Sequence, residues 1–64
     1  SNASKTDLEM IASLSEAQKT VAATLSGASD LAASYGDKLT EDLCVERGRV
    51  HEKFAWLLDA HLGS

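Results

Sequence analysis

The sequence predicts an all-α protein in which a long helix is followed by a shorter antiparallel helix, forming a helical hairpin. The chain lacks proline and is rich in alanine, leucine and charged residues, a composition typical of long helices. Apolar residues recur at steps of three and four before Gly48, and a second apolar period follows it. Because 64 residues bury too little surface for a strong core, we expect two hairpins to dimerise into a four-helix bundle.

The first helix is predicted over about residues 5–43. It begins at Ser4 or Thr6, since Thr6 has the spacing of a capping box and acidic residues follow it. Gly27 and Gly36 each cost about 1 kcal/mol relative to alanine inside a helix. The seven-residue spacing of the apolar stripe nevertheless continues across both glycines. We therefore expect one continuous helix, bent near Gly27.

The turn is predicted at about residues 44–48, because the first heptad frame would place Asp42 and Glu46 in the apolar seam. Gly48 is a residue type typical of turns. The second helix is predicted over about residues 49–62, where apolar residues share one helical face: Val50, Phe54, Leu57, Leu58, His61 and Leu62. The competing interpretation is one unbroken rod that passes through Gly48 with a shift of phase.

The apolar stripes predict the surface at which the chain meets its partner. Gln18 lies within the stripe and either fixes the register of association or is solvated at its edge. Trp56 points about 150° away from the stripe of the second helix, at about 100° per residue. It either anchors a partner or packs near the turn. The expected interface residues are Ile11, Leu14, Gln18, Val21, Leu25, Ala28, Ala32, Tyr35, Leu39, Val50, Phe54, Trp56 and Leu57.

The net charge of −4 and a pI near 4.9 argue against nucleic acid and anionic membrane surfaces as partners. No apolar run approaches the ~18 residues of a membrane span. The single cysteine, Cys44, cannot form an internal disulfide, which fits a reducing compartment. We therefore expect a cytoplasmic protein that associates with a second copy of itself or with a different protein.

The sequence predicts neither a catalytic nor a metal site. Cys44, His51 and His61 are the only soft metal ligands, and their spacings match no compact zinc pattern. Nucleophilic catalysis by Cys44 would need a base and an oxyanion donor, and only His51 is a candidate base. We expect no cofactor and no enzymatic activity in this chain.

Residues 1–3 are typical of the remnant of a cleaved expression tag, and residues 4–64 are expected to form a single helical module. The sequence after the remnant does not begin with methionine. We therefore expect a segment excised from a longer protein.

The stretch at residues 26–39, SGASDLAASYGDKL, resembles a helical region that precedes the catalytic domain of bacterial GGDEF-type diguanylate cyclases. The resemblance rests on small residues followed by a Tyr-Gly-x-x-Leu signature at residues 35–39. It implies a regulatory or dimerising helical region, and the GGDEF motif itself is absent from the sequence. The expected function is non-catalytic oligomerisation in a signalling protein. The alternative is an adaptor that docks a different protein through an exposed apolar face around Trp56.

Overall fold

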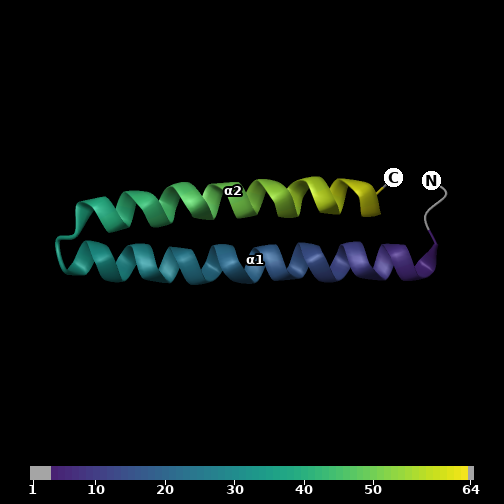
Figure 1. Cartoon of the computed structure of the whole chain (residues 1–64), viewed down its shortest axis with the longest axis horizontal. Coiled ribbons are helices and arrows are strands. Elements are labelled where there is room, and N and C mark those ends of the chain that lie inside the picture. Colours follow the sequence, from purple (N-terminus) through teal and green to yellow (C-terminus); the bar gives the residue numbers. More distant parts are fainter. Residues whose placement is uncertain (1–3, 64) are drawn as a thin grey trace.

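The computed structural model describes residues 4–63 and consists of two antiparallel helices. Helix α1 spans Lys5–Ser34 and helix α2 spans Lys38–Leu62. The two helices lie side by side, so that the start of α1 and the end of α2 are at the same end of a rod of 49 × 13 × 12 Å (Figure 1). The predicted helical hairpin is confirmed. The expected tag remnant at residues 1–3 lies outside the described residues.

Helix α1 begins and continues much as its sequence predicts. The side chain of Ser4 accepts a hydrogen bond from the backbone N–H of Asp7 at 3.1 Å, which identifies Ser4 as the N-cap. Asp7 also places a negative charge in the first turn, where the helix dipole favours it. The helix passes through Gly27 without interruption, as the continuous heptad spacing predicts.

Helix α1 ends in a Schellman motif centred on Gly36. Gly36 has a φ of +74°, in the left-handed region that glycine adopts without steric cost. The N–H of Gly36 donates to the carbonyl of Ala33, and the N–H of Asp37 donates to that of Ala32. Asp37 then caps α2, because its carboxylate accepts from the Thr40 N–H at 3.0 Å and from the Thr40 hydroxyl at 2.6 Å.

The predicted boundaries are therefore wrong: the first helix does not reach residue 43, and residues 44–48 are helical. A glycine followed by an N-capping aspartate stops one helix and starts the next within three residues. This local signal prevails over the apolar spacing, which happens to continue across the turn. Gly48 lies inside α2 and packs against Leu25.

The seam between the helices is lined by small residues at seven-residue intervals. Ser15, Ala22 and Ser29 of α1 are buried, as are Gly48 and Ala55 of α2. Ala22, Ala32 and Ala55 are the buried hydrophobic residues of the described chain, so none of its large apolar side chains is fully buried. Small side chains let two helix axes approach closely, but they remove little apolar surface from water.

Polar contacts fix the register of the seam. The Ser15 hydroxyl donates to Asp59 at 2.5 Å and approaches the Ala55 carbonyl at 3.5 Å, while the Ser29 hydroxyl approaches the Glu41 carbonyl at 3.5 Å. Ala22 lies seven residues from each serine, and Gly48 seven residues from Glu41 and from Ala55. Ala22 is therefore level with Gly48.

Candidate interaction surface

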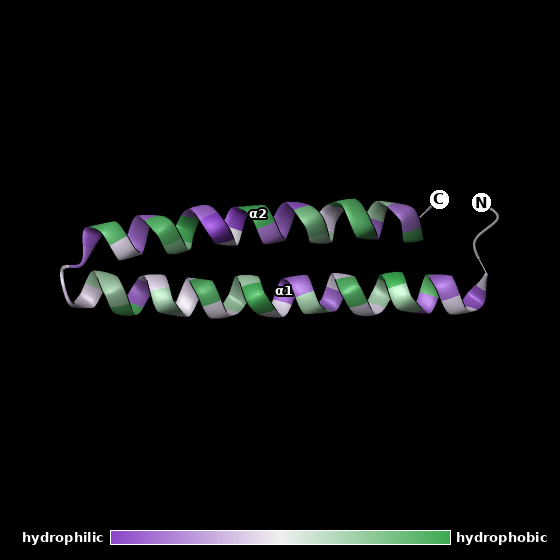
Figure 2. Cartoon of the chain, in the orientation of Figure 1, coloured by the Kyte–Doolittle hydropathy of each residue, from purple (hydrophilic) through white to green (hydrophobic). Residues whose placement is uncertain are grey.

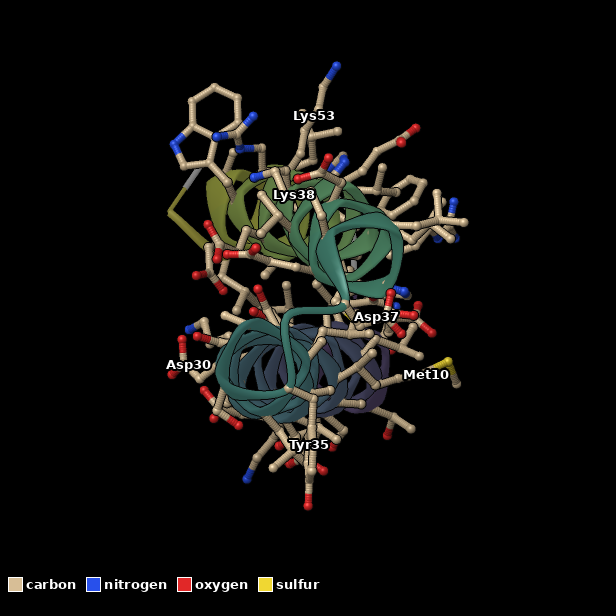
Figure 3. All side chains as sticks on the ribbon, turned by 90° about the vertical axis from the view of Figure 1, so that its left-hand side faces the viewer. Met10, Asp30, Tyr35, Asp37, Lys38 and Lys53 are labelled. Carbon is tan, nitrogen blue, oxygen red and sulfur yellow. The ribbon has the colours of Figure 1, made fainter. Side chains whose placement is uncertain are left out.

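The hairpin has two distinct sides, which one ion pair identifies. Lys19 on α1 contacts Asp59 on α2 at 3.1 Å. Each of these residues lies four positions after a buried seam residue, Ser15 and Ala55 respectively. The residue just before each seam residue lies on the other side of the helix from Lys19 and Asp59. Leu14 and Phe54 occupy these positions and therefore share the opposite side of the hairpin. Figure 3 shows the same division on α1, with Met10 and Asp30 pointing to opposite sides.

The side that carries Leu14 and Phe54 presents exposed large apolar side chains from both helices. Its large residues keep between 41% and 59% of their surface accessible to water. Apolar segments recur along the whole length of both helices instead of gathering at one end (Figure 2). The apolar face, as the term is used below, consists of Met10, Leu14, Val21 and Leu31 of α1 with Leu43, Phe54 and Leu57 of α2.

Charged residues are almost absent from this side. The sequence contains ten acidic and six basic residues. The apolar face occupies two heptad positions on each helix: those of Met10 and Leu14 on α1, and those of Leu43 and Phe54 on α2. Of the acidic and basic residues of the two helices, only Asp7 and Arg47 fall at these positions. Contiguous exposed apolar patches of this kind mark surfaces that other molecules cover.

The opposite side is polar. It contains the contacts of Lys19 with Asp59 and with Glu16, the latter at 3.4 Å. The hydrogen bond from Ser15, with the nearby Lys19 ammonium, lowers the pKa of the Asp59 carboxyl. The same contact with Asp59 raises the pKa of Lys19. Both charged groups are exposed to solvent, so these shifts describe a surface cluster.

A shallow groove of about 400 Å³ also opens on the polar side, and its lining includes Ala22, Ser29 and Gly48 of the seam. Cys44 is half-buried in its wall, beside Glu41 and Arg49. Among residues 4–63, no group of three or more His, Cys, Asp or Glu side chains is arranged to hold a metal ion. His51 instead donates from its Nδ1–H to the Gln18 amide oxygen at 2.5 Å.

The structure separates the expected interface residues into four groups. Ile11, Gln18, Leu25 and Ala32 are buried or half-buried on the α1 stripe that faces α2. Leu14, Val21, Phe54 and Leu57 belong to the apolar face, with Val50 and Ala28 at its heptad positions. Tyr35 and Leu39 are highly exposed at the turn end. Trp56 is 68% exposed and lies on the polar side. It follows Glu52 by one helical turn and Val45 by three.

The predicted seam thus merged two different stripes. Seven-residue spacing groups Ile11 with Gln18, Leu25 and Ala32, and it groups Leu14 separately with Val21, Ala28 and Tyr35. The first group faces α2 and the second faces outward. The expected interface omits Met10, Leu31 and Leu43 of the apolar face, although the seven-residue spacing of Leu43 from Val50 and Leu57 carries the signal. The seam residues Ser15 and Gly48 were also missed as contacts, because small residues carry no hydropathy signal.

No protein-family model, curated protein or solved structure matches this chain. The resemblance of residues 26–39 to helices that precede GGDEF domains therefore stays a prediction. No helix among the described residues is long and apolar enough to cross a membrane.

Proposed function

We propose that this chain is a non-catalytic helical module for self-association, in which the apolar face covers the same face of a second copy. The two hairpins then form a four-helix bundle. The observation that carries the proposal is the apolar face itself, where seven large side chains are about half exposed on a side almost free of charge.

The exposed area agrees with the requirement of a stable dimer. The accessible surface of the chain is 4759 Å², whereas a compact monomer of 6.8 kDa exposes about 4,000 Å². The excess is of the same size as the ~800 Å² that each partner buries in a standard interface. The excess fits the shape of residues 4–63, whose two helices form a single thin layer.

The weak seam supports the same proposal. Ala22, Ala32 and Ala55 contribute little hydrophobic stabilisation, since each buries only one methyl group. Larger apolar residues of the seam, such as Ile11 and Leu25, are only half-buried, and seven more lie exposed on the apolar face. Association with a second copy would remove them from water, and folding and dimerisation would then be coupled.

The first test is the absolute molar mass by light scattering over a dilution series, with far-UV circular dichroism on the same samples. The chain mass is 6.8 kDa. We expect a helical species of twice that mass that loses helix as it dissociates. A fully helical monomer at every concentration would contradict self-association.

A matched pair of variants tests whether the apolar face carries the association. Val21 and Val45 have almost equal exposure, 41% and 38%, but Val21 lies on the apolar face and Val45 on the polar side. We expect Val21→Asp to give monomers at concentrations where Val45→Asp remains dimeric. Equal effects of the two substitutions would contradict the assignment. Leu25→Asp is a poor test, because Leu25 packs in the seam against Gly48.

A second candidate function is an adaptor that docks a different protein, and the exposure of Trp56 favours it. Trp56 does not belong to the apolar face, so the two functions use different surfaces. Trp56→Ala should leave the mass of the dimer unchanged, whereas Phe54→Ala on the same helix should weaken association. If Trp56→Ala alone produced monomers, the polar side would be the self-association surface instead.

The resemblance at residues 26–39 adds a proposal about context. In that proposal the module belongs to the regulatory region of a bacterial diguanylate cyclase, where self-association controls how two attached catalytic domains meet. A full-length parent protein that lacks cyclase activity would contradict it.

A further inference from the structure

We propose that the polar side of the hairpin docks a cationic amphipathic helix of a different protein. This inference makes the adaptor candidate chemically specific. It does not depend on self-association, because the polar side lies opposite the apolar face. Three features of the polar side support it: the sign of its charge, the length of its groove, and the exposed tryptophan just beyond one end of the groove.

The excess negative charge of the chain lies on the polar side. This side follows the heptad positions of Lys19 and Glu16 on α1 and those of Val45 and Trp56 on α2. Seven of the ten acidic residues lie at these positions or in the groove, against four of the six basic ones. The polar side therefore carries most of the net charge of −4. Charge complementarity favours a basic partner and excludes acidic ones.

Two carboxylates of the groove are available to such a partner. The basic residues Lys19 and Lys38 are already engaged with acidic residues of their own chain, Lys38 with Asp42 at 3.2 Å. Asp30 and Glu52 line the groove and are exposed, and neither takes part in an ion pair among residues 4–63. Figure 3 shows Asp30 pointing out from the polar side of α1. A basic side chain of a partner can pair with each of them.

The length of the groove determines the spacing of basic residues that fits it. Its carboxylates on α2, those of Glu41 and Glu52, are eleven residues apart, which is about 16 Å along the helix. On a partner helix that lies along the groove, residues eleven apart are separated by the same distance and share one face. Between the carboxylates the lining includes the small residues Ala22, Ser26 and Gly48, which let a third helix approach closely.

Trp56 extends the same surface by one helical turn. It follows Glu52 by four residues, so the two side chains are neighbours on the surface of α2. The residue is 68% exposed, and the face of an indole ring attracts cations. A lysine or arginine that pairs with Glu52 therefore lies next to the indole. Tryptophan is also enriched among the residues that dominate the energy of interfaces. The juxtaposition of Glu52 and Trp56 is the observation that favours a cationic partner over an apolar one.

Two synthetic peptides of equal composition test this docking site. Each is a helix of alanine and leucine with two lysines, which are eleven residues apart in the first peptide and nine apart in the second. At about 100° per residue, the lysines share one face of the first peptide and lie on opposite faces of the second. Trp56 is the only tryptophan of the chain, so its fluorescence reports on the polar side. We expect the first peptide to shift the emission to shorter wavelength, and the second to bind about fivefold more weakly.

A matched pair of variants tests the role of Glu52. Glu52→Gln and Glu46→Gln remove the same charge from exposed positions of α2, but Glu46 lies at neither heptad position of the polar side. We expect Glu52→Gln to weaken binding of the first peptide about two- to fivefold and Glu46→Gln to leave it unchanged. Equal effects of the two variants, or equal binding of the two peptides, would overturn the docking site in favour of unspecific attraction to an acidic chain.

Light scattering on the same samples identifies the surface that the peptide covers. A first peptide that lowers the molar mass of the self-associated chain without moving the Trp56 emission would bind the apolar face, and this result would overturn the docking site. Binding that shifts the emission and adds the mass of the peptide supports it. Self-association is measured on the chain without peptide, so failure of the proposed function and failure of the docking site are distinguishable.

Discussion

Replacing Gly48 by alanine distinguishes a glycine inside a helix from a glycine in a turn. Gly48 is helical and buried, and a Cβ built on it would meet only the Cβ of Leu25, at 3.9 Å, an ordinary van der Waals contact. Alanine is favoured over glycine in a helix by about 1 kcal/mol. The new methyl group also contributes up to ~0.8 kcal/mol by its burial in the seam. We expect Gly48→Ala to raise the free energy of unfolding by about 1–1.5 kcal/mol.

The assay is thermal unfolding followed by circular dichroism at one fixed protein concentration, because association makes the midpoint depend on concentration. A gain of about 1 kcal/mol raises the midpoint of a domain of this size by roughly 4–8 °C. Gly36→Ala is the matched control. With a φ of +74° at Gly36, alanine there costs about 1–2 kcal/mol and lowers the midpoint. A fall in stability for Gly48→Ala would refute the assignment of Gly48 to the interior of α2.

Three further predictions concern single contacts. The pKa of Asp59 is lowered from its ordinary value of 3.8, so its carboxylate stabilises the fold fully above that pH. We expect this stabilisation to decline as the pH falls from 3.8 through the lowered pKa. An acid titration followed by ellipticity measures the decline. Ser15→Ala removes the hydrogen bond that contributes most to this shift, so the NMR titration midpoint of Asp59 should rise, and an unchanged midpoint would contradict the contact. Gly27→Ala places a methyl group in open space on α1, so the substitution should raise the free energy of unfolding by the helix preference of alanine alone, about 1 kcal/mol, with no contribution from packing. No rise in the urea midpoint would mean that α1 bends there.

The helical class and the hairpin could be predicted because both depend on composition and on long periodic segments. The turn could not be placed from periodicity alone. Tyr35 keeps the seven-residue spacing from Leu14 although it is the C-cap residue of α1, and it points away from α2 (Figure 3). The decisive signal was local: Gly36 before Asp37, a helix stop followed by an N-cap. Gly48 gave the opposite error, since a lone glycine is equally compatible with a turn and with a close helix contact.

The division of the apolar residues was harder to predict for a physical reason. A hydropathy pattern identifies the residues that avoid water, but it does not say which element covers them. Leu14 and Leu25 fall in one stripe of three- and four-residue steps, although each belongs to its own seven-residue series. The arrangement of α2 places Leu25 in the seam and Leu14 outside it. The choice depends on small residues such as Ser15 and Ala22, whose role is steric.

Exchanging a small seam residue for a large one tests that steric role directly. Ala22 is 6% exposed and level with Gly48, which has no side chain. Its neighbour Ala23 is exposed on the side away from the apolar face. Leucine and alanine are both strong helix formers, so Ala22→Leu and Ala23→Leu differ mainly in packing. We expect Ala22→Leu to cost about 1–3 kcal/mol by overpacking, measured as a lower urea midpoint, and Ala23→Leu to change it little. Equal stability of the two variants would mean that the helices can move apart at no cost in free energy. Close approach through small residues would then not determine which apolar side chains stay exposed to a partner.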